Sequence, residues 1–345
     1  MRGSVEDPPR SVNRASVACY SPPMNADPAA PLVSVLLASR NGARFLPEAL
    51  ASIASQTYPA IEVVLVDDGS TDATGSLLGA FASKHPRALC LRAQGVGPAA
   101  ARDLAYRASS GSLLALHDDD DVSRPDRIER QTEAFAERSR LGVLGSVAHV
   151  IDEHGARVQA FSVPLGPHAA RRVLRRAPPF VNGSVMMRRS VYEAAGGFRA
   201  PFRSAEDFDL WLRVPVDVEM DNLAEPLYAW RGHSGNITAR ARGEMTYYAA
   251  VAHAFADERR ETGHDSIQLL AESASKEDFL ARYSRAGRVA FYCGEMLARQ
   301  GRAREARDYL GRALLDPSSR RAALSWWGLT WLLPFTSRGR AASRT

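Results

Sequence analysis

The sequence contains few cysteines and few lysines. Its three cysteines, Cys19, Cys90 and Cys293, lie far apart in a chain of 345 residues and show neither a disulfide framework nor metal-ligand spacing. This pattern favours a reducing, cytoplasmic location. Lysine occurs only at Lys84 and Lys276, so arginine supplies nearly all of the positive charge, and the net charge is +5. Because these arginines are spread along the chain without interleaved aromatic residues, nucleic acid is not an expected partner.

Long apolar runs are also scarce. Residues 1–31 contain repeated prolines and lack the continuous apolar core of a signal peptide, so we expect a disordered leader. Near the other end, residues 321–345 place Trp326, Trp327 and Trp331 in an apolar stretch that is shorter than a bilayer span of about 20 residues. This stretch predicts an amphipathic helix at a membrane surface, such as the inner leaflet. A helix buried in the protein is the open alternative.

The sequence also lacks a complete dinucleotide-binding loop. The segment QGVGPAAARD contains Gly95 and Gly97 but lacks the full G-x-G-x-x-G pattern and the acidic residue that follows it further along the chain. We therefore reject binding of a nicotinamide cofactor.

Short apolar runs alternate with helical segments from Leu32 onward. The runs at 32–38, 61–67, 88–92 and 112–117 have the length of strands, and the helical patterns cover 46–56, 72–84 and 98–109. This alternation predicts an α/β fold with a mainly parallel sheet and helices on both faces. Ligands bind beyond the carboxyl ends of strands in such sheets, so the residues that follow each strand are the first candidates for a site.

Acidic residues follow two of these strands. The segment VDDGSTD places Asp67 and Asp68 before Gly69, which permits a tight turn; a plain strand-to-helix turn is the open alternative. The fourth strand ends in four consecutive carboxylates, Asp118–Asp121, whose mutual repulsion requires a positive partner. Capping of the helix that follows would account for one or two of them.

Two acidic strand ends at one edge of a sheet predict a cation site. Mg²⁺ and Mn²⁺ prefer oxygen ligands, and Mg²⁺ typically takes one or two protein carboxylates while water and substrate phosphates supply the rest. We therefore expect a divalent metal that binds together with a phosphorylated substrate.

A further acidic cluster lies in SAEDFDLWLRV, residues 204–214. The spacing places Phe208 and Trp211 on one stripe of a helix, with Glu206, Asp207 and Asp209 before or beside it. These carboxylates could interact with the helix N-terminus, or one of them could remove a proton from a substrate hydroxyl. The residues alone leave both interpretations open.

These segments, in this order, resemble a family 2 glycosyltransferase with the GT-A fold. The resemblance covers about residues 32–238 and rests on four stretches: VSVLLASRNGARFLPEALASIASQTYPAIEVVLVDDGSTD, GPAAARDLAYRASSGSLLALHDDDDVSRPDRIERQ, NGSVMMRRSVYEAAGGF and AEDFDLWLRV. It implies transfer of a sugar from a nucleoside diphosphate sugar to an acceptor hydroxyl, with inversion at the anomeric carbon. The expected acceptor is a glycan or a lipid-linked molecule, in polysaccharide or other cell-surface glycan synthesis.

The resemblance also implies roles for individual residues. Ala38 corresponds to a backbone contact to the nucleotide, and Asp68 to the carboxylate that reads the base. Arg102 corresponds to an arginine near the base and phosphates, although a surface arginine on a helix would have the same sequence appearance. The Asp-x-Asp motif of the family falls on Asp118 and Asp120, with Asp120 the expected metal ligand and Asp118 a ligand of the ribose or the metal. The implied cofactor is Mn²⁺ or Mg²⁺.

Asp207 matches the catalytic base of the family, and Glu206 beside it is expected to orient the loop. His233 resembles a histidine found near the diphosphate in many relatives, and a solvent-facing loop histidine is the open alternative. His117 stands where an apolar residue is common, so we expect it to pack in the core and not to bind a ligand.

The sequence becomes helical after about residue 240. Residues 290–317 resemble one tetratricopeptide unit, a helical hairpin that needs further surface to pack on. The predicted organisation is a leader over 1–31, a GT-A domain over 32–240, a helical extension over 241–320 and an amphipathic tail over 321–345. Two other function classes stay open, a catalytically degenerate scaffold of the same fold and, less favoured, a nucleotidyltransferase.

Overall fold

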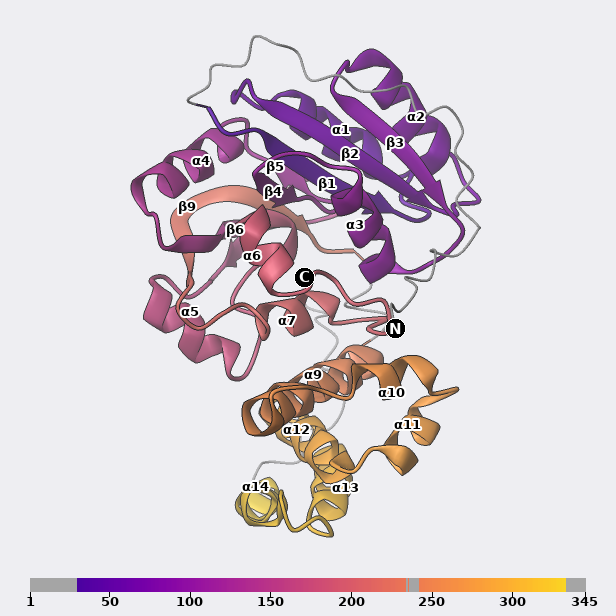
Figure 1. The fold of residues 1–345 in the computed structure, drawn as a ribbon, viewed down its shortest axis with the longest axis vertical. Helices are drawn as coiled ribbons and strands as arrows, with labels where there is room; N and C mark the ends of the chain where they lie inside the picture. The colour runs from indigo at the N-terminus through magenta and orange to yellow at the C-terminus, as the bar shows by residue number, and fades with distance from the viewer. Residues whose placement is uncertain (1–29, 234, 236–241, 333–345) are drawn as a thin grey trace, which may run out of the picture. The chain divides into compact units, whose positions relative to one another are not determined.

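The computed structural model describes residues 30–233, 235 and 242–332 (Figure 1). Its described residues form two compact units. The first comprises residues 30–198 and 214–233, and the second comprises residues 199–213, 235 and 242–332. The predicted leader lies almost entirely outside the described residues, as does the part of the predicted tail beyond residue 332. The segment that carries Asp207 therefore groups with the C-terminal helices.

The first unit is built on a nine-stranded sheet with the order β3-β2-β1-β4-β8-β6-β9-β5, and β7 pairs with β6. Its strands are β1 (Val33–Ser39), β2 (Ile61–Asp68), β3 (Ala88–Ala93), β4 (Leu113–Leu116), β5 (Val122–Ser123), β6 (Leu141–Ile151), β7 (Arg157–Phe161), β8 (Met186–Arg188) and β9 (Glu219–Arg231). The four strands predicted from the sequence form the parallel half, β3-β2-β1-β4. The other half is mixed, because β8 runs antiparallel to both β4 and β6 while β6 and β9 are parallel.

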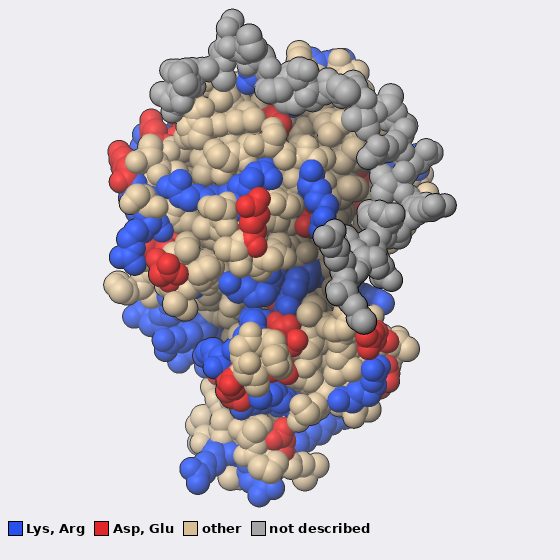
Figure 2. Space-filling view, in the orientation of Figure 1, with Lys and Arg blue, Asp and Glu red and all other residues tan. Residues whose placement is uncertain are grey.

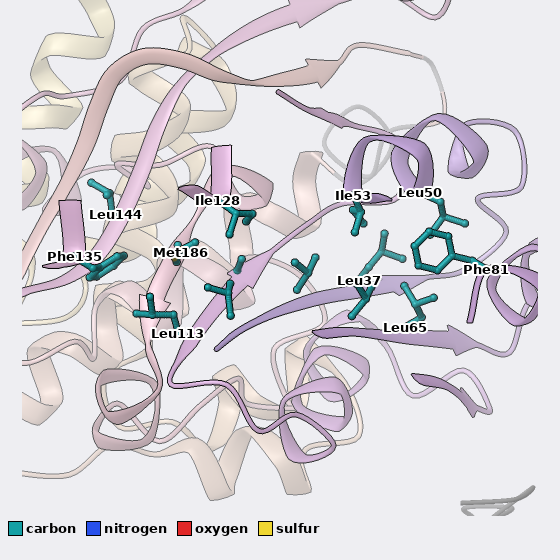
Figure 3. Packing of buried hydrophobic residues seen from close by; sticks show 14 of the residues in the cluster. Leu37, Leu50, Ile53, Leu65, Phe81, Leu113, Ile128, Phe135, Leu144 and Met186 are labelled. Atoms are coloured by element: carbon teal, nitrogen blue, oxygen red, sulfur yellow. The ribbon is translucent and has the colours of Figure 1, made fainter. Parts of the chain in front are cut away.

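Helices flank this sheet and bury its core. They are α1 (Leu46–Ala54), α2 (Thr74–Lys84), α3 (Pro98–Arg107), α4 (Arg127–Glu137), α5 (Pro167–Leu174) and α6 (Arg189–Ala194), together with a 3-10 turn, η1 (Asn182–Ser184). Side chains from α1, α2 and α4, among them Ile53, Phe81 and Ile128, belong to one apolar cluster with Leu37 of β1 on one face of the strands (Figure 3). Helix α3 contacts β1 and β2 but contributes nothing to that cluster, so it covers the other face.

The second unit is helical in the residues described. It contains α7 (Glu206–Trp211), α9 (Arg242–Thr262), α10 (Ile267–Glu272), α11 (Lys276–Arg282), α12 (Ala286–Arg299), α13 (Ala303–Ala313) and α14 (Arg320–Leu332). Helices α12 and α13 pack against each other and form the hairpin that the sequence predicts. Its identification as a tetratricopeptide unit stays a prediction.

Helix α14 has a buried side and an exposed side. Trp326 packs on Leu297 and Ala306 of the hairpin, and Trp327 is partly buried beside Leu310. The packing of these two tryptophans agrees with the alternative of a helix buried in the protein. On the other side of α14, Leu324 and Leu329 are 54% and 49% exposed. No helix among the described residues is both long enough and apolar enough to cross a bilayer.

Candidate active site

The loops after β1 and β2 are joined at the carboxyl edge of the parallel strands. Asn41 has a positive φ of 56°, its backbone N–H donates to the Ser70 hydroxyl (3.0 Å), and its side-chain oxygen accepts from the Thr71 N–H (2.9 Å). Gly69 has a φ of +73°, and a Cβ there would lie 2.9 Å from the backbone nitrogen of Gly95. The tight turn expected at Gly69 is confirmed, and the close approach of the loop after β3 explains why only glycine fits.

Asp68 holds the loop between β3 and α3. Its buried carboxylate accepts backbone hydrogen bonds from Val96 (2.7 Å) and Gly97 (2.9 Å). Ala38 lies near the end of β1, opposite Val66 of β2, and is partly exposed. Both predicted nucleotide contacts therefore lie at the edge where the sequence placed them, and their roles toward a nucleotide stay predictions.

The four consecutive aspartates after β4, hereafter the acidic loop (Asp118–Asp121), point to four different partners. Arg102 of α3 pairs with Asp118 (Nη2 to Oδ1, 2.9 Å). Ser39 at the end of β1 donates to Asp119. The side chain of Arg102 is mostly buried, so the surface-arginine alternative is not what the structure shows.

The second half of the acidic loop contacts the end of β9. The imidazole Nε2 of His233 lies 2.9 Å from Oδ2 of Asp120, and the ring packs on Phe45 with 4.6 Å between centroids. The His233 side chain is only 12% exposed, so the solvent-facing alternative for this residue is wrong. Asp121 accepts from the backbone N–H of Arg231 (2.8 Å) and lies beside the Tyr228 hydroxyl.

Negative charge in the acidic loop exceeds what these partners neutralise. Burial, together with repulsion from the neighbouring Asp120, raises the pKa of Asp119 to about 7. Burial, followed by repulsion from Asp118, also raises the pKa of Asp120 despite the opposing effect of His233. The pKa of Asp121 is raised well above its ordinary value, again mainly by burial. A cation bound here would remove this penalty.

Helix capping does not explain the acidic loop. The helix that follows, α4, has Asp126 at its N-cap with no side-chain cap hydrogen bond, and the short strand β5 separates it from the four aspartates. The capping alternative is therefore wrong.

The donor set of the acidic loop fits a hard divalent cation that arrives with a phosphate. Within the described residues, no three His, Cys, Asp or Glu side chains are arranged to enclose a metal. A Mg²⁺ or Mn²⁺ site needs only one or two protein carboxylates when substrate phosphates and water complete the coordination. The partly exposed carboxylates of Asp118 and Asp120 satisfy that lower requirement.

Two buried arginines that the sequence analysis missed support the acidic loop. Arg231 is fully buried, donates to the carbonyl oxygens of Asp120 (2.8 Å) and Asp152 (3.2 Å), and pairs with Glu48. Arg127 donates to the carbonyl of Leu116 at the end of β4 (2.9 Å), and burial lowers the pKa of this guanidinium to about 10. In a chain this rich in arginine, sequence alone does not distinguish them from surface residues.

Gly183 of η1 lies against the same loop. A Cβ at this position would stand 2.1 Å from the Tyr228 hydroxyl oxygen and 2.9 Å from Oδ2 of Asp118. The backbone N–H of Asp118 donates to that hydroxyl (3.2 Å). His117, just before the loop, is buried as predicted, and burial lowers the pKa of its ring to about 4.

Asp207 belongs to the second unit and is described within it. It is the second residue of α7, partly exposed, and its Oδ1 accepts from the backbone N–H of Phe208 (2.7 Å). The N-cap residue of α7 is Ala205, which has no side chain that could cap the helix, and the Asp207 carboxylate accepts from an N–H of the first turn, so both interpretations of this carboxylate stay open. The structure thus brings together Arg102, Asp118, Asp120 and His233 in the first unit, and Asp207 belongs to the second unit.

Comparison with known proteins gives a consistent result. The model of the family described as "Glycosyl transferase family 2" matches residues 34–196. A curated relative, the "Putative glycosyltransferase EpsE" of Bacillus subtilis, is 35% identical over 217 residues, which cover 61% of this chain and 77% of the relative. The "O-antigen biosynthesis protein RfbC" of Myxococcus xanthus is 28% identical over 241 residues, covering 68% of this chain and 18% of that protein.

Solved structures share the fold. A 1–349 fragment of S. aureus TarS in complex with UDP superposes with a TM-score of 0.56 at 16% identity, covering 86% of this chain and 91% of that one. The mannosyltransferase PcManGT from Pyrobaculum calidifontis, in complex with GDP-Man and Mn²⁺, superposes with a TM-score of 0.53 at 21% identity. The match covers 89% of this chain and 81% of the mannosyltransferase. The GT-A fold predicted from the sequence is confirmed.

Proposed function

The chain belongs to glycosyltransferase family 2, and from this membership we propose that it transfers a sugar from a nucleoside diphosphate sugar to an acceptor hydroxyl with inversion at the anomeric carbon. The observation that carries this proposal is the acidic loop, in which four consecutive buried or partly buried carboxylates gather at the carboxyl edge of the parallel strands. The name of one relative, the O-antigen biosynthesis protein RfbC, supports a polysaccharide or other cell-surface glycan as the product.

For the donor, we assign nucleotide contacts to Ala38, Asp68, Arg102 and Asp118. Asp68 and Ala38 lie at adjacent strand ends, and Arg102 supplies a mostly buried positive charge beside Asp118. A guanidinium in this place attracts phosphate. That two solved neighbours hold UDP and GDP-Man supports a nucleotide-sugar donor without selecting the base.

For the metal, we assign Asp120 and Asp118 as the protein ligands of Mn²⁺ or Mg²⁺. Such an ion, when bound, offsets the negative charge on the departing diphosphate. The Mn²⁺ in the mannosyltransferase neighbour supports this use of a divalent ion. His233 keeps Asp120 in place through its Nε2 contact.

For the chemistry, we assign Asp207 as the general base. Its carboxylate accepts the proton of the acceptor hydroxyl, the freed oxygen lone pair forms the new bond to the anomeric carbon, and the bond from that carbon to the diphosphate oxygen breaks with its electron pair on the leaving group. Attack from the side opposite the leaving group inverts the configuration.

For location, we propose a cytoplasmic enzyme that contacts the inner membrane through α14. Leu324 and Leu329 are about half exposed on this helix, and residues 317–345 contain five arginines and no acidic residue. Co-sedimentation of the full chain with phosphatidylglycerol vesicles should exceed that with phosphatidylcholine vesicles, and Leu324→Ser/Leu329→Ser should remove the difference. Equal pelleting of both proteins on both vesicles would contradict the membrane contact.

The proposal for donor and metal is tested by binding. Nucleotide sugars are screened by thermal shift with and without Mn²⁺, and UDP and GDP are then titrated calorimetrically. Asp120→Ala should lower Mn²⁺-dependent nucleotide affinity by about tenfold or more, since the loss of a charged ligand contact is worth more than about 1.4 kcal/mol. The matched control is Asp126→Ala, a carboxylate that pairs with Arg124. Retained affinity in Asp120→Ala would refute the metal assignment.

A further inference from the structure

A buried ion network lies behind the helix that carries Asp207. Asp209, two residues further along α7, is fully buried and contacts two arginines. Arg213 donates to its Oδ2 from Nη2 (2.9 Å), and Arg199 donates to the same oxygen from Nε (2.9 Å) and to the other oxygen from Nη2. Both oxygens of this carboxylate are therefore held.

The network continues into the C-terminal helices. Nη1 of Arg199 donates to both oxygens of Asp265 (3.0 and 2.8 Å), which lies between α9 and α10. Asp265 also pairs with Arg259 of α9, and Arg259 reaches the carbonyl oxygen of Leu212 at the end of α7 (3.5 Å). Although burial opposes it, pairing with Arg199 and Arg259 holds the pKa of Asp265 below its ordinary value, so this carboxylate stays charged at neutral pH.

Helix α7 cannot hold its own orientation. It has six residues, and its N-cap residue, Ala205, has no capping side chain and lies in the left-handed region with a φ of 55°. Isolated helices of this length are unstable in water, and a left-handed alanine is unfavourable by about 1 kcal/mol. Contacts to other elements must therefore fix this helix.

The same helix geometry connects the network to Asp207. Residues two apart on an α-helix differ in direction by about 200°, so a side chain at 209 that points into the ion network leaves the one at 207 pointing away from it. This agrees with the burial, because Asp209 is fully buried and Asp207 is partly exposed. Rotation or displacement of α7 would move Asp207 directly.

We propose that Asp209, Arg199 and Asp265 are positioning residues that orient Asp207 through α7, so that the C-terminal helices are a working part of the enzyme. This inference rests on the proposed role of Asp207 as the base. Buried ion networks contribute little net stability compared with apolar packing of the same shape. Stability alone therefore does not account for this network, whereas orientation of the reacting carboxylate does. A misplacement of about 1 Å at a reacting group can lower the rate about 100-fold.

The test uses Asp265→Asn in the full chain, with Asp257→Asn as matched control. Asp257 is a mostly buried carboxylate of α9 that pairs with Arg260 and Arg288, and within the described residues it makes no hydrogen bond or ion pair to α7. Release of nucleoside diphosphate from UDP-GlcNAc and GDP-mannose in Mg²⁺, with water as acceptor, gives kcat and KM, and amide hydrogen exchange reports on residues 206–212.

In Asp265→Asn we expect kcat to fall about tenfold or more, with the donor KM within about twofold and faster exchange in α7. Asp257→Asn should lose comparable thermal stability and keep both kcat and α7 protection. The double variant Asp207→Asn/Asp265→Asn should be no slower than Asp207→Asn, because Asp265 acts through Asp207. If Asp265→Asn does not fold, Arg259→Lys is the second variant, because it keeps the positive charge and removes the planar guanidinium. It should likewise lower kcat and leave the donor KM within about twofold.

Equal kcat and equal α7 exchange in Asp265→Asn and Asp257→Asn would overturn the positioning role while leaving Asp207 as the base. Full turnover in Asp207→Asn would overturn the base assignment, and the positioning role with it. The two failures are thereby distinguished.

Discussion

Protonation of His253 should destabilise the second unit as the pH falls. His253 lies on the buried side of α9, stacked on the Tyr292 ring (4.6 Å between centroids, 17° between planes) and edge-to-face with Phe208 of α7 (4.9 Å). Burial lowers the pKa of His253 to about 4, with Arg260 also lowering it and Asp257 opposing. In the unfolded chain this pKa is about 6.5.

The sign and size of the effect follow from linkage. Because the folded pKa lies below the unfolded one, the unfolded chain binds the proton first, so stability is full above about pH 6.5 and declines as the pH falls toward 4. Between pH 7 and pH 5 the loss is about 2 kcal/mol, obtained from about 1.36 kcal/mol for each pH unit below the unfolded pKa.

Denaturant unfolding of wild type and His253→Phe, followed by tryptophan fluorescence at several pH values, measures this effect. Phenylalanine keeps a ring between Tyr292 and Phe208 and cannot titrate. Carboxylates elsewhere contribute equally to both proteins, so the difference in unfolding free energy isolates His253. The difference should shift by about 2 kcal/mol in favour of the variant from pH 7 to pH 5. A difference that stays constant with pH would show that folding does not lower the pKa of His253.

Three further predictions concern the first unit. Gly69→Ala should lower stability by about 1–3 kcal/mol in chemical denaturation, because the added Cβ meets the Gly95 backbone at a positive φ, and Ser76→Ala on the exposed part of α2 should not. Arg102→Met should weaken calorimetric UDP binding about tenfold or more, since it removes a buried positive charge beside Asp118; unchanged affinity would contradict the phosphate role. Glu62→Gln should cost about 1–3 kcal/mol, because the buried carboxylate accepts from Ser34 and Gly111, yet leave kcat unchanged; a selective loss of kcat would show that this end of the sheet contributes to the reaction.

Sequence reasoning predicted the parallel half of the sheet well. Strands β1 to β4 and helices α1 to α3 follow the predicted runs to within about two residues, because each is a short apolar or amphipathic segment with clear polar boundaries. The strands of the other half were not predicted. Strand β8 has three residues and β5 has two, and their pairing depends on partners far away in the chain.

The residues of the site also divide into those that the sequence predicts and those that only the folded chain reveals. The acidic loop and Asp68 were found because carboxylates at strand ends are an unusual local pattern, and Arg102 was placed beside them by resemblance alone. Arg231 and the partnership of Asp209 with Asp265 were missed. A buried guanidinium is recognised only when the folded chain shows what surrounds it, since the contacts of Arg231 come from α1, the acidic loop and the turn after β6.

The anomeric configuration of the released sugar distinguishes an inverting transferase from a retaining one. UDP-GlcNAc and GDP-mannose carry α-linked sugars, so an inverting enzyme that uses water as acceptor must release the β-anomer first, before mutarotation in solution. Proton NMR of the anomeric signals, recorded from the first minutes of incubation in Mg²⁺, follows this product. We predict early accumulation of the β-anomer by the wild-type chain, loss of this signal in Asp207→Asn by about 100-fold or more, and normal product in Asp126→Ala. Early release of the α-anomer would contradict inversion at the anomeric carbon, and an unchanged rate in Asp207→Asn would contradict the role of Asp207 as the general base.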